Sequence, residues 1–425
     1  MRILFLANFY PPHEIGGQER SCQEVVEGLR ARGHKCWVLT SMHGVDNVPT
    51  DEPGVRRWLY LEMDMVPLRH GWIFFTQRKK REAHNLHRLE QLIADFKPDV
   101  VYVWGMWNLP RSLPALAERL LPDRVAYRFA EYWPTLPTQH EFFWRAPARN
   151  WRTYLPKQIL SAVALAILAR EQKHVDLQFA HAMCVSAGTK QVLLEGGVPV
   201  AHARVIHTGL DVDEFLNGLA ARKENDSQTL KLLYAGRMTV EKGIDTILEA
   251  LAVLAQDQPQ RQVHLQLAGG GLEAYLSELR EKIAHLGLSP MVTFLGRVPA
   301  QEMPGLMQAC DILIVPSIWP EPFARVVLEG MVCRMVVVAT PTGGTGEIIR
   351  DGENGMLFPA GDSKVLAERI QHLADRPELR KKLAEAGWVT VMNHFTKKGM
   401  LDQIEDFLGE AAFSHRGAEG QAHAR

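Results

Sequence analysis

Residues 231–243 read KLLYAGRMTVEKG, a short apolar run followed by a polar loop that begins and ends with glycine. The run 231–236 is typical of a buried strand, and the apolar periodicity over 244–255 predicts a helix directly after the loop. A strand that continues through a glycine-rich loop into a helix is the repeating unit of parallel sheets. This stretch therefore indicates an α/β fold.

The same alternation of strands and helices extends in both directions along the chain. Further strands are predicted at 2–7, 36–39, 99–104, 125–129, 183–186, 263–268, 292–296, 312–316 and 335–339. Helices are predicted at 18–32, 244–255, 273–286, 324–333 and 363–373. Continuous apolar runs fit strands that are buried on both faces, so we predict two Rossmann-like, doubly wound parallel sheets.

The length of 425 residues fits two or three domains, and the pattern favours two. The polar segment 222–228 separates the two series of strands, which places the boundary between 212 and 230. We predict an N-terminal domain over 1–212, a C-terminal domain over 230–387 and a disordered tail over 413–425. Two such domains would face a cleft at the carboxyl ends of their strands, where ligands bind.

Composition argues against several classes of protein. Hydrophobic residues make up 46% and charged residues 23%, as in ordinary globular proteins, and a net charge of −1 gives no field for nucleic acid. The five cysteines form no CxxC pair, which argues against a disulfide framework or zinc site and favours a reducing, cytoplasmic location. The most apolar long stretch, 159–169, is far shorter than the roughly 20 residues of a membrane span, and the start of the chain is expected to be a strand rather than a signal peptide.

The loop after the strand at 231–236 supplies two cations, Arg237 and Lys242. Free backbone N–H groups at the start of a helix favour an anion, and an arginine fork with a lysine charge would add to that preference. A phosphate site and a solvated loop are both open at this point.

A second motif, 316–331, reads PSIWPEPFARVVLEGM and carries Glu321 and Glu329. Glu329 follows Glu321 by eight positions, about 12 Å along a helix, so the two carboxylates could hold hydroxyls on different sugar rings of one extended ligand. The alternatives are an N-cap for Glu321 and an exposed helix charge for Glu329. A third motif, PTGGTGE at 341–347, lets a ligand approach the backbone closely or forms a plain tight turn.

Together these motifs resemble the retaining GT-B glycosyltransferases of family 4, the glycosyl transferases group 1. The resemblance covers much of the second half, including YAGR at 234–237, LAGGG at 267–271 and FLGRV at 294–298. In the first half, GGQER at 16–20 resembles the first glycine loop of the family, and IHTGLD at 206–211 resembles the end of its first domain. The segment 388–412 resembles the terminal helices that cross back to the first domain.

The resemblance implies transfer of a sugar from a UDP- or GDP-sugar, with retention of configuration and without a required metal or other cofactor. It implies that Arg237 and Lys242 bind the diphosphate, that Glu329 holds the ribose and that Glu321 contacts the sugar. Fixed cations would then stabilise the departing diphosphate. The remaining donor-binding residues that it implies are Gly17, Arg297, Val298, Phe323 and Ala324.

One position departs from the family pattern. Many relatives carry a histidine just after the strand that ends at Phe129, where this chain has Ala130 followed by Glu131. We expect Glu131 to take over part of the polar role of that histidine near the transferred sugar. The departure also leaves two alternatives open, a non-catalytic nucleotide-sugar-binding subunit and another GT-B enzyme such as a sugar-nucleotide epimerase or a phosphorylase.

The acceptor is expected in the first domain, and a glycan, a lipid-linked glycan and a small molecule all remain open. Asn108, Arg111 and Tyr132 follow predicted strands and either face the acceptor or make local contacts. Aromatic and basic residues occur together at 72–81 and 142–157, and residues 1–170 carry 23 Lys or Arg against 17 Asp or Glu. This mixture fits either peripheral contact with a membrane, at the inner face of the cytoplasmic membrane, or ordinary helix packing with solvated charges.

Overall fold

The structure, a computed structural model, describes residues 1–13, 16–44, 51–66, 69–148, 154–172, 175–217, 229–258 and 260–422, with side chains up to residue 413. The chain divides into two compact units. Unit 1 comprises Met1–Cys184, Lys190–Ile206 and Leu401–Arg425, and unit 2 comprises Val185–Thr189 and His207–Met400. The predicted domain limits and the predicted tail stay predictions, and residues 218–228 of the predicted boundary lie outside the described residues.

Unit 1 contains an eight-stranded sheet with the strand order β3-β4-β2-β1-β5-β6-β7-β8. All neighbouring strands are parallel except β3 and β4, so the other strands share one carboxyl edge. Its strands are β1 (Arg2–Ala7), β2 (Lys35–Ser41), β3 (Asp51–Glu52), β4 (Val55–Leu59), β5 (Val100–Gly105), β6 (Val125–Phe129), β7 (His181–Cys184) and β8 (Arg204–Val205). Its helices are α1 (Gly17–Ala31), α2 (His70–Thr76), α3 (Arg78–Phe96), α4 (Ser112–Leu120), α5 (Gln139–Arg145) and α6 (Tyr154–Gln172); α7 (Ala187–Glu195) begins in unit 2 and ends in unit 1.

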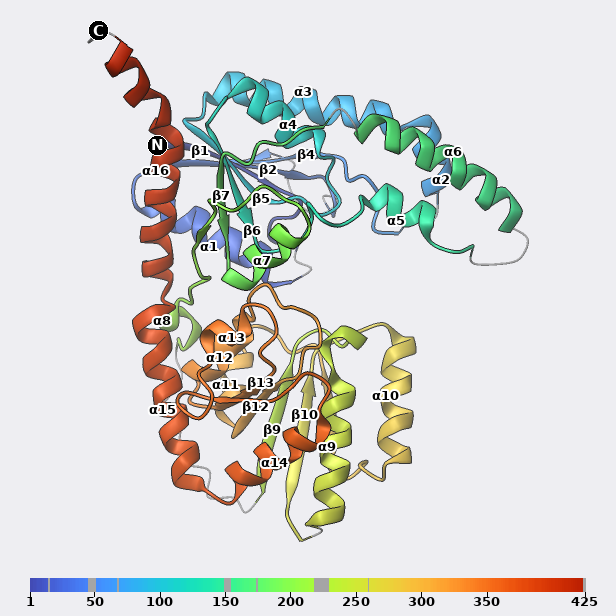
Figure 1. Ribbon diagram of the computed structural model, residues 1–425, viewed down its shortest axis with the longest axis vertical. Coiled ribbons are helices and arrows are strands. Elements are labelled where there is room, and N and C mark those ends of the chain that lie inside the picture. The colour runs from blue at the N-terminus through green and yellow to red at the C-terminus, as the bar shows by residue number, and fades with distance from the viewer. Residues whose placement is uncertain are drawn as a thin grey trace. The chain divides into compact units, whose positions relative to one another are not determined.

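Helices cover both faces of this sheet, as Figure 1 shows for α1 on one side and α3 and α4 on the other. Successive residues of β1 point to opposite faces, so Leu4 and Leu6 pack with α3 and α4 in one large apolar cluster. Ile3 and Phe5, which alternate with them, are also fully buried. From residue 3 to residue 7 the strand is therefore apolar throughout, because it has no solvent side there.

The last helix of the chain, α16 (Lys397–Ala422), completes unit 1. A side chain at Gly28 of α1 would meet Leu401 at 2.5 Å, so the two helices pack closely where α1 has no side chain. Arg32 and His34 both reach the Glu405 carboxylate at 2.7 Å. The buried apolar residues of α16 within unit 1 include Leu401, Ile404, Leu408 and Ala411.

Unit 2 contains a six-stranded sheet with the strand order β11-β10-β9-β12-β13-β14, and all its pairs are parallel. Its strands are β9 (Leu230–Ala235), β10 (Val263–Ala268), β11 (Val292–Gly296), β12 (Ile312–Val315), β13 (Val336–Ala339) and β14 (Met356–Leu357). Its helices are α8 (Val212–Phe215), the 3-10 turn Val240–Lys242, α9 (Ile244–Asp257), α10 (Glu273–His285), α11 (Met303–Gln308), α12 (Arg325–Val332), α13 (Thr345–Ile348), α14 (Ser363–Ala374) and α15 (Pro377–His394).

The alternation of strand side chains divides the interior of unit 2 into two clusters. Ile312 and Ile314 of β12 pack with α9, α10 and α14, whereas Leu313 and Val315 pack with α11 and α12. The predicted α/β class with two doubly wound, Rossmann-like sheets is therefore confirmed. The predicted strands at 125–129, 263–268 and 292–296 match β6, β10 and β11 residue for residue.

Candidate active site

The loop after β9 runs along the carboxyl edge of the unit 2 sheet. Its backbone is joined to the loop after β10, because Met238 N donates to Gly270 O at 2.8 Å and Gly236 N donates to Ala268 O at 3.0 Å. Gly269, with φ +144°, must be glycine because a Cβ there would lie 1.8 Å from the Gly236 carbonyl oxygen. The two glycine loops thus form one backbone surface.

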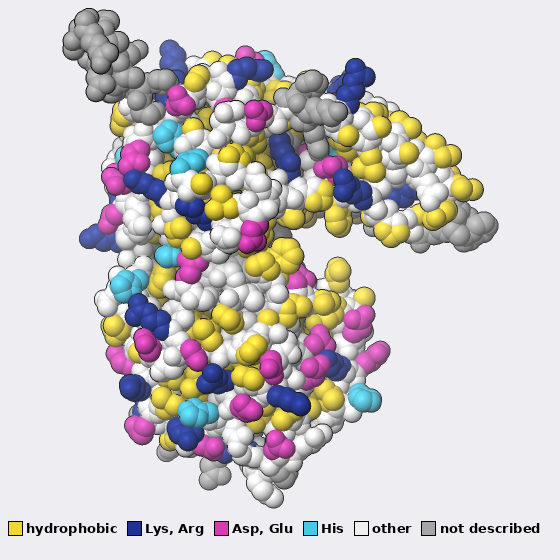
Figure 2. All heavy atoms as spheres, in the orientation of Figure 1, with side chains coloured by type: hydrophobic (Ala, Val, Ile, Leu, Met, Phe, Trp, Pro, Cys, Tyr) yellow, Lys and Arg dark blue, Asp and Glu magenta, His cyan; other side chains and the backbone are white. Residues whose placement is uncertain are grey.

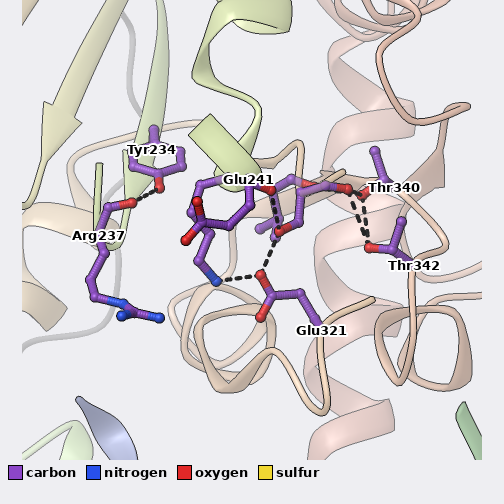
Figure 3. Close-up of polar contacts among 9 residues, drawn as sticks. Tyr234, Arg237, Glu241, Glu321, Thr340 and Thr342 are labelled. Carbon is purple, nitrogen blue, oxygen red and sulfur yellow. Dashed lines mark hydrogen bonds and ion pairs between the residues drawn. The ribbon is translucent and has the colours of Figure 1, made fainter. Parts of the chain in front are cut away.

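Lys242 and Glu321 meet at this edge although they are 79 residues apart in the chain. The Lys242 ammonium forms an ion pair with the Glu321 carboxylate, and the Ser317 hydroxyl donates to the same carboxylate oxygen (Figure 3). The Lys242 and Glu321 side chains are only 21% and 12% exposed. The sequence had placed them in separate motifs, and the fold joins them in one polar cluster.

Backbone contacts fix the loop that carries Ser317 and Glu321. The Glu241 carbonyl accepts from Ile318 N at 3.0 Å, and Thr340 Oγ1 donates to Ser317 O at 2.6 Å. These bonds connect the loop after β12 to the loops after β9 and β13 (Figure 3). The carboxylate is therefore held by strand ends rather than by a free helix terminus.

The 341–347 loop supports Glu321 through its backbone. Gly344 N donates to Glu321 O at 2.8 Å, and a Cβ at Gly343, with φ +55°, would lie 2.1 Å from that oxygen. Glu347 contributes at a different place, because its carboxylate accepts from Gly188 N at 2.9 Å and from His207 Nε2 at 2.9 Å. The 341–347 motif thus contains a turn that requires glycine at position 343. Its last residue, Glu347, provides a carboxylate that caps the start of α7.

Arg237 lies beside this cluster and is exposed. The Tyr234 hydroxyl donates to the Arg237 carbonyl at 2.5 Å, and the side chain extends away from Tyr234 (Figure 3). Among the described residues, no carboxylate lies within ion-pair distance of its guanidinium. Its charge is therefore available to an anion at the sheet edge.

The other donor-binding candidates of unit 2 are spread over neighbouring loops. Glu329 lies on α12 and has an oxygen 3.4 Å from Arg325 Nε, and its side chain is half-buried. Arg297 follows β11, and a Cβ at Gly270 would lie 3.1 Å from its Nε, so this side chain covers the second glycine loop. Val298 and Phe323 pack against the apolar cluster under α12, and Ala324 is a buried member of it.

Phe323 has a packing role in addition to its predicted one. Its ring centroid lies 5.6 Å from that of His207 and 5.9 Å from that of Phe395. Ala324 precedes the first residue of α12 as its N-cap. The donor-binding roles of both residues stay predictions.

In unit 1, the carboxyl edge of the sheet brings Gln18 to the end of β6. Gly17 is the first residue of α1, and no described heavy atom lies within 4 Å of where its Cβ would be. Gln18 Nε2 donates to Ala130 O at 2.9 Å, which ties the glycine loop to the residue after β6. Ala130 is buried and follows the strand directly, at the position predicted for it.

Glu131 lies at the same edge and accepts hydrogen bonds from the backbone N–H groups of Met106 at 3.2 Å and Trp107 at 3.3 Å. Burial raises the pKa of the Glu131 carboxyl to about 7, although these two N–H groups oppose the rise. The Glu19 carboxylate raises it further, and the buried Arg128 lowers it. Near neutral pH this carboxyl is therefore a mixture of protonated and ionised forms.

A cavity of about 120 Å³ lies within unit 1, beyond the ends of β4 and β5. Glu62 and Arg111 line it, and burial raises the pKa of the Glu62 carboxyl to about 8. Arg111 donates to Trp133 O at 2.8 Å and to Leu136 O at 2.5 Å. The sequence had singled out Arg111 only. No pattern in the sequence marked Glu62, because the strand before it, VRRWL, is not apolar.

Asn108, the second residue expected near the acceptor, has a structural role. Its amide accepts from Met63 N at 2.9 Å and donates to Met63 O at 2.7 Å, and it is buried. Tyr132 belongs to the main apolar cluster of unit 1. For these two residues the local contact, which the sequence left open, is what the structure shows.

Comparison with known proteins identifies the family of this chain. The family Glycosyltransferase Family 4 matches residues 15–214, and the family Glycosyl transferases group 1 matches residues 219–388. EpsD of Bacillus subtilis (strain 168), which carries a glycosyltransferase name, is 31% identical over 275 residues, 64% of this chain and 68% of that protein. The chain belongs to the family 4, group 1 glycosyltransferases.

A D-inositol 3-phosphate glycosyltransferase of Corynebacterium jeikeium (strain K411) is 32% identical over 206 residues, 46% of this chain. The match spans 49% of that relative, about half its length. The crystal structure of HepE from Anabaena in complex with UDP and glucose superposes with a TM-score of 0.68 at 22% identity, covering 96% of this chain and 99% of that one. The fold is therefore GT-B.

Proposed function

We propose that this protein is a retaining glycosyltransferase that moves a sugar from a UDP- or GDP-sugar to an acceptor. The observation that carries the proposal is the polar cluster at the carboxyl edge of unit 2, where Lys242, Glu321 and the exposed Arg237 guanidinium meet two glycine loops. A diphosphate needs cations and backbone N–H donors, and a sugar needs a fixed carboxylate. The complex of HepE with UDP and glucose supports a nucleotide donor by analogy.

In this proposal the chain's own groups stabilise the leaving diphosphate. Arg237 offers a planar fork to two phosphate oxygens, and Lys242 adds a point charge. Glu321, held by Ser317, receives the sugar hydroxyls, and Glu329 receives those of the ribose. Preorganised cations act on the charge that develops as the bond to the sugar breaks, so no metal is required for this step.

On the acceptor side, Gly17 would approach the diphosphate, and Glu131 would act near the transferred sugar. A carboxyl with a pKa of about 7 can keep its proton beside a diphosphate and donate a hydrogen bond, which a carboxylate of ordinary pKa cannot do. We propose the unit 1 cavity at Glu62 and Arg111 as part of the acceptor site. A glycan, a lipid-linked glycan and a small molecule are the acceptor classes to be tried.

The proposed location is the cytoplasm. The five cysteines are all free and buried, which supports a reducing compartment.

Titration calorimetry with UDP and GDP tests the donor site. We expect one nucleotide to bind selectively and Arg237→Ala to weaken it by at least about tenfold, the worth of one charged hydrogen bond. Arg350→Ala is the matched control, because Arg350 is an exposed arginine of the same unit whose nearest carboxylate is 4.0 Å away. Equal weakening in both variants would remove Arg237 from the site.

A second candidate is a nucleotide-sugar-binding subunit without catalysis, which Ala130 at the usual histidine position favours. The assay uses the nucleotide sugar whose base was found to bind. Release of free UDP or GDP together with formation of a glycoside would support the glycosyltransferase rather than the subunit. Binding without turnover on any acceptor class would favour the subunit. A changed sugar on the intact nucleotide would favour an epimerase.

A further inference from the structure

Three helices of unit 1 form an arm with a small core of its own. Phe74 of α2, Trp144 of α5, and Ala164 and Leu168 of α6 are buried together in a cluster separate from the main core. Figure 1 shows α2, α5 and α6 extending away from the unit 1 sheet. These three helices, 70–76, 139–145 and 154–172, are called the arm below.

Many large apolar side chains of the arm are exposed. On α6, Leu155 and Ile159 are 68% and 67% exposed, and Val163 continues the same i, i+4 row with 49%. Other large apolar side chains exposed on the arm are Trp72, Phe75, Phe142, Tyr154 and Leu160. Figure 2 shows hydrophobic side chains over much of this part of the surface. A contiguous exposed apolar surface of this kind marks an interaction site.

Basic residues lie on the arm and beside it. The three helices of the arm contain three Lys or Arg and two Asp or Glu, and the adjoining positions 69 and 78–81 add five more Lys or Arg. Both acids are paired, Glu171 with Arg78 at 2.6 Å and Glu141 with Arg145 at 3.5 Å. The side chains of Lys79 and Arg145 remain 80% and 64% exposed. The arm and the adjoining start of α3 together therefore present net positive charge beside the apolar row.

We propose that the arm docks on a lipid bilayer that contains anionic head groups. An apolar row with exposed aromatic and basic side chains matches both layers of such a surface, the acyl boundary and the negative head groups. A second copy of this chain is a poorer occupant, because two arms placed face to face would bring like charges together. In the part of the chain that the structure describes, no helix meets the length and apolarity of a membrane span, so α6 would lie along the surface.

Arg149, Trp151 and Arg152, which the sequence had included in this basic and aromatic segment, lie outside the described residues. The proposal does not depend on them. The donor site does not enter it either, since every residue used belongs to unit 1.

Sedimentation of the full chain with vesicles tests the docking. Vesicles of phosphatidylcholine with about 30% phosphatidylglycerol should pellet the protein at low salt, and 0.5 M NaCl should weaken the binding by at least about fivefold, since salt screens exposed charges. The double variant Leu155→Glu/Ile159→Glu should lower the vesicle affinity at least about tenfold. Leu272→Glu, a substitution at a 77% exposed leucine of unit 2, is the matched control and should bind like the wild type.

A second readout identifies the inserted side chain. Brominated lipids should quench part of the tryptophan fluorescence of the wild type, and Trp72→Phe should lose that part while still pelleting. Circular dichroism and UDP binding show whether each variant folds and keeps its donor site, which separates a failure of docking from a failure of the proposed function. No pelleting of the wild type with anionic vesicles, or equal pelleting of the double variant, would overturn the proposal. A lipid-free dimer that the double variant dissociates would assign the surface to a second copy instead.

Discussion

The ion pair between Lys242 and Glu321 gives the most direct test of the site, through a double-mutant cycle with Lys242→Met and Glu321→Gln. Pairs at exposed positions contribute about 0.2–1 kcal/mol, and breaking a fully buried pair costs about 3–5 kcal/mol. With side chains 21% and 12% exposed, this pair lies between the two limits. We expect a coupling free energy of about 1.5 kcal/mol in the stability of unit 2.

The asymmetry of the site predicts how the two single variants differ. Removing Lys242 leaves a Glu321 carboxylate that is only 12% exposed without a cation, whereas in Glu321→Gln the amide oxygen can still accept from both the Ser317 hydroxyl and the Lys242 ammonium, which is 21% exposed. Lys242→Met should therefore destabilise more than Glu321→Gln, by about 1 kcal/mol. Urea unfolding followed by circular dichroism measures both.

The affinity of the same variants for UDP or GDP gives an independent test of the cluster. Since Glu321 and the diphosphate would compete for Lys242, Glu321→Gln should bind UDP or GDP at least as tightly as the wild type, while Lys242→Met should bind about tenfold more weakly. Glu321→Gln should still lose turnover with the complete nucleotide sugar. A coupling free energy below about 0.3 kcal/mol, or equal weakening of nucleotide binding in both variants, would refute this account of the cluster.

Three further outcomes follow from other parts of the molecule. Gly269→Ala should destabilise unit 2 by more than about 3 kcal/mol, because its Cβ would lie 1.8 Å from a backbone oxygen, whereas Gly287→Ala, at φ +69° with open space around it, should cost about 1 kcal/mol in urea unfolding. The Glu131 carboxyl should contribute stability that is lost as the pH rises from about 4.5 through about 7, at most about 3 kcal/mol, because the folded state holds a proton on Glu131 that the unfolded state releases; the difference between the wild type and Glu131→Gln in a pH series of urea titrations isolates this contribution from that of Glu62, whose pKa is raised to about 8. Leu248→Ala, in the buried cluster under α9, should lower the unfolding free energy by about 2–5 kcal/mol, and a loss below 1 kcal/mol would argue against close packing there.

Strands buried on both faces, such as β1 and β6, were predictable because a parallel strand between two helical layers is apolar on nearly every residue. β10 and β11 were also predicted with the observed bounds, although β10 contains His264 and Gln266 and β11 is an edge strand with mostly exposed residues. β4 was missed, because its sequence VRRWL places two arginines in the middle. Arg57 is buried there and is neutralised by Glu52 at 2.7 Å, with a further bond to Pro11 O at 2.6 Å. A buried arginine with its own partners cannot be recognised from hydropathy.

The site was predictable as a set of motifs but not as a set of contacts. Arg237 and Lys242 stood out because they follow a strand in a glycine-bounded loop. Their neighbours depend on strand order, since β9 and β12 are adjacent in the sheet although β10 and β11 lie between them in the sequence. The pairing of Lys242 with Glu321, and that of Glu347 with the start of α7, follow from this topology, which no local pattern contains.

The contribution of α16 to unit 1 has a consequence for biosynthesis. Leu401 and Glu405 reach α1 only after all of unit 2 has been synthesised, and at about 5–20 residues per second the interval after residue 206 lasts about 10–40 s. During that time the face of α1 around Gly28 has no covering helix. An apolar surface of the nascent first unit therefore stays exposed to other chains. Chaperone demand during translation should therefore be concentrated on the half of the protein that is made first.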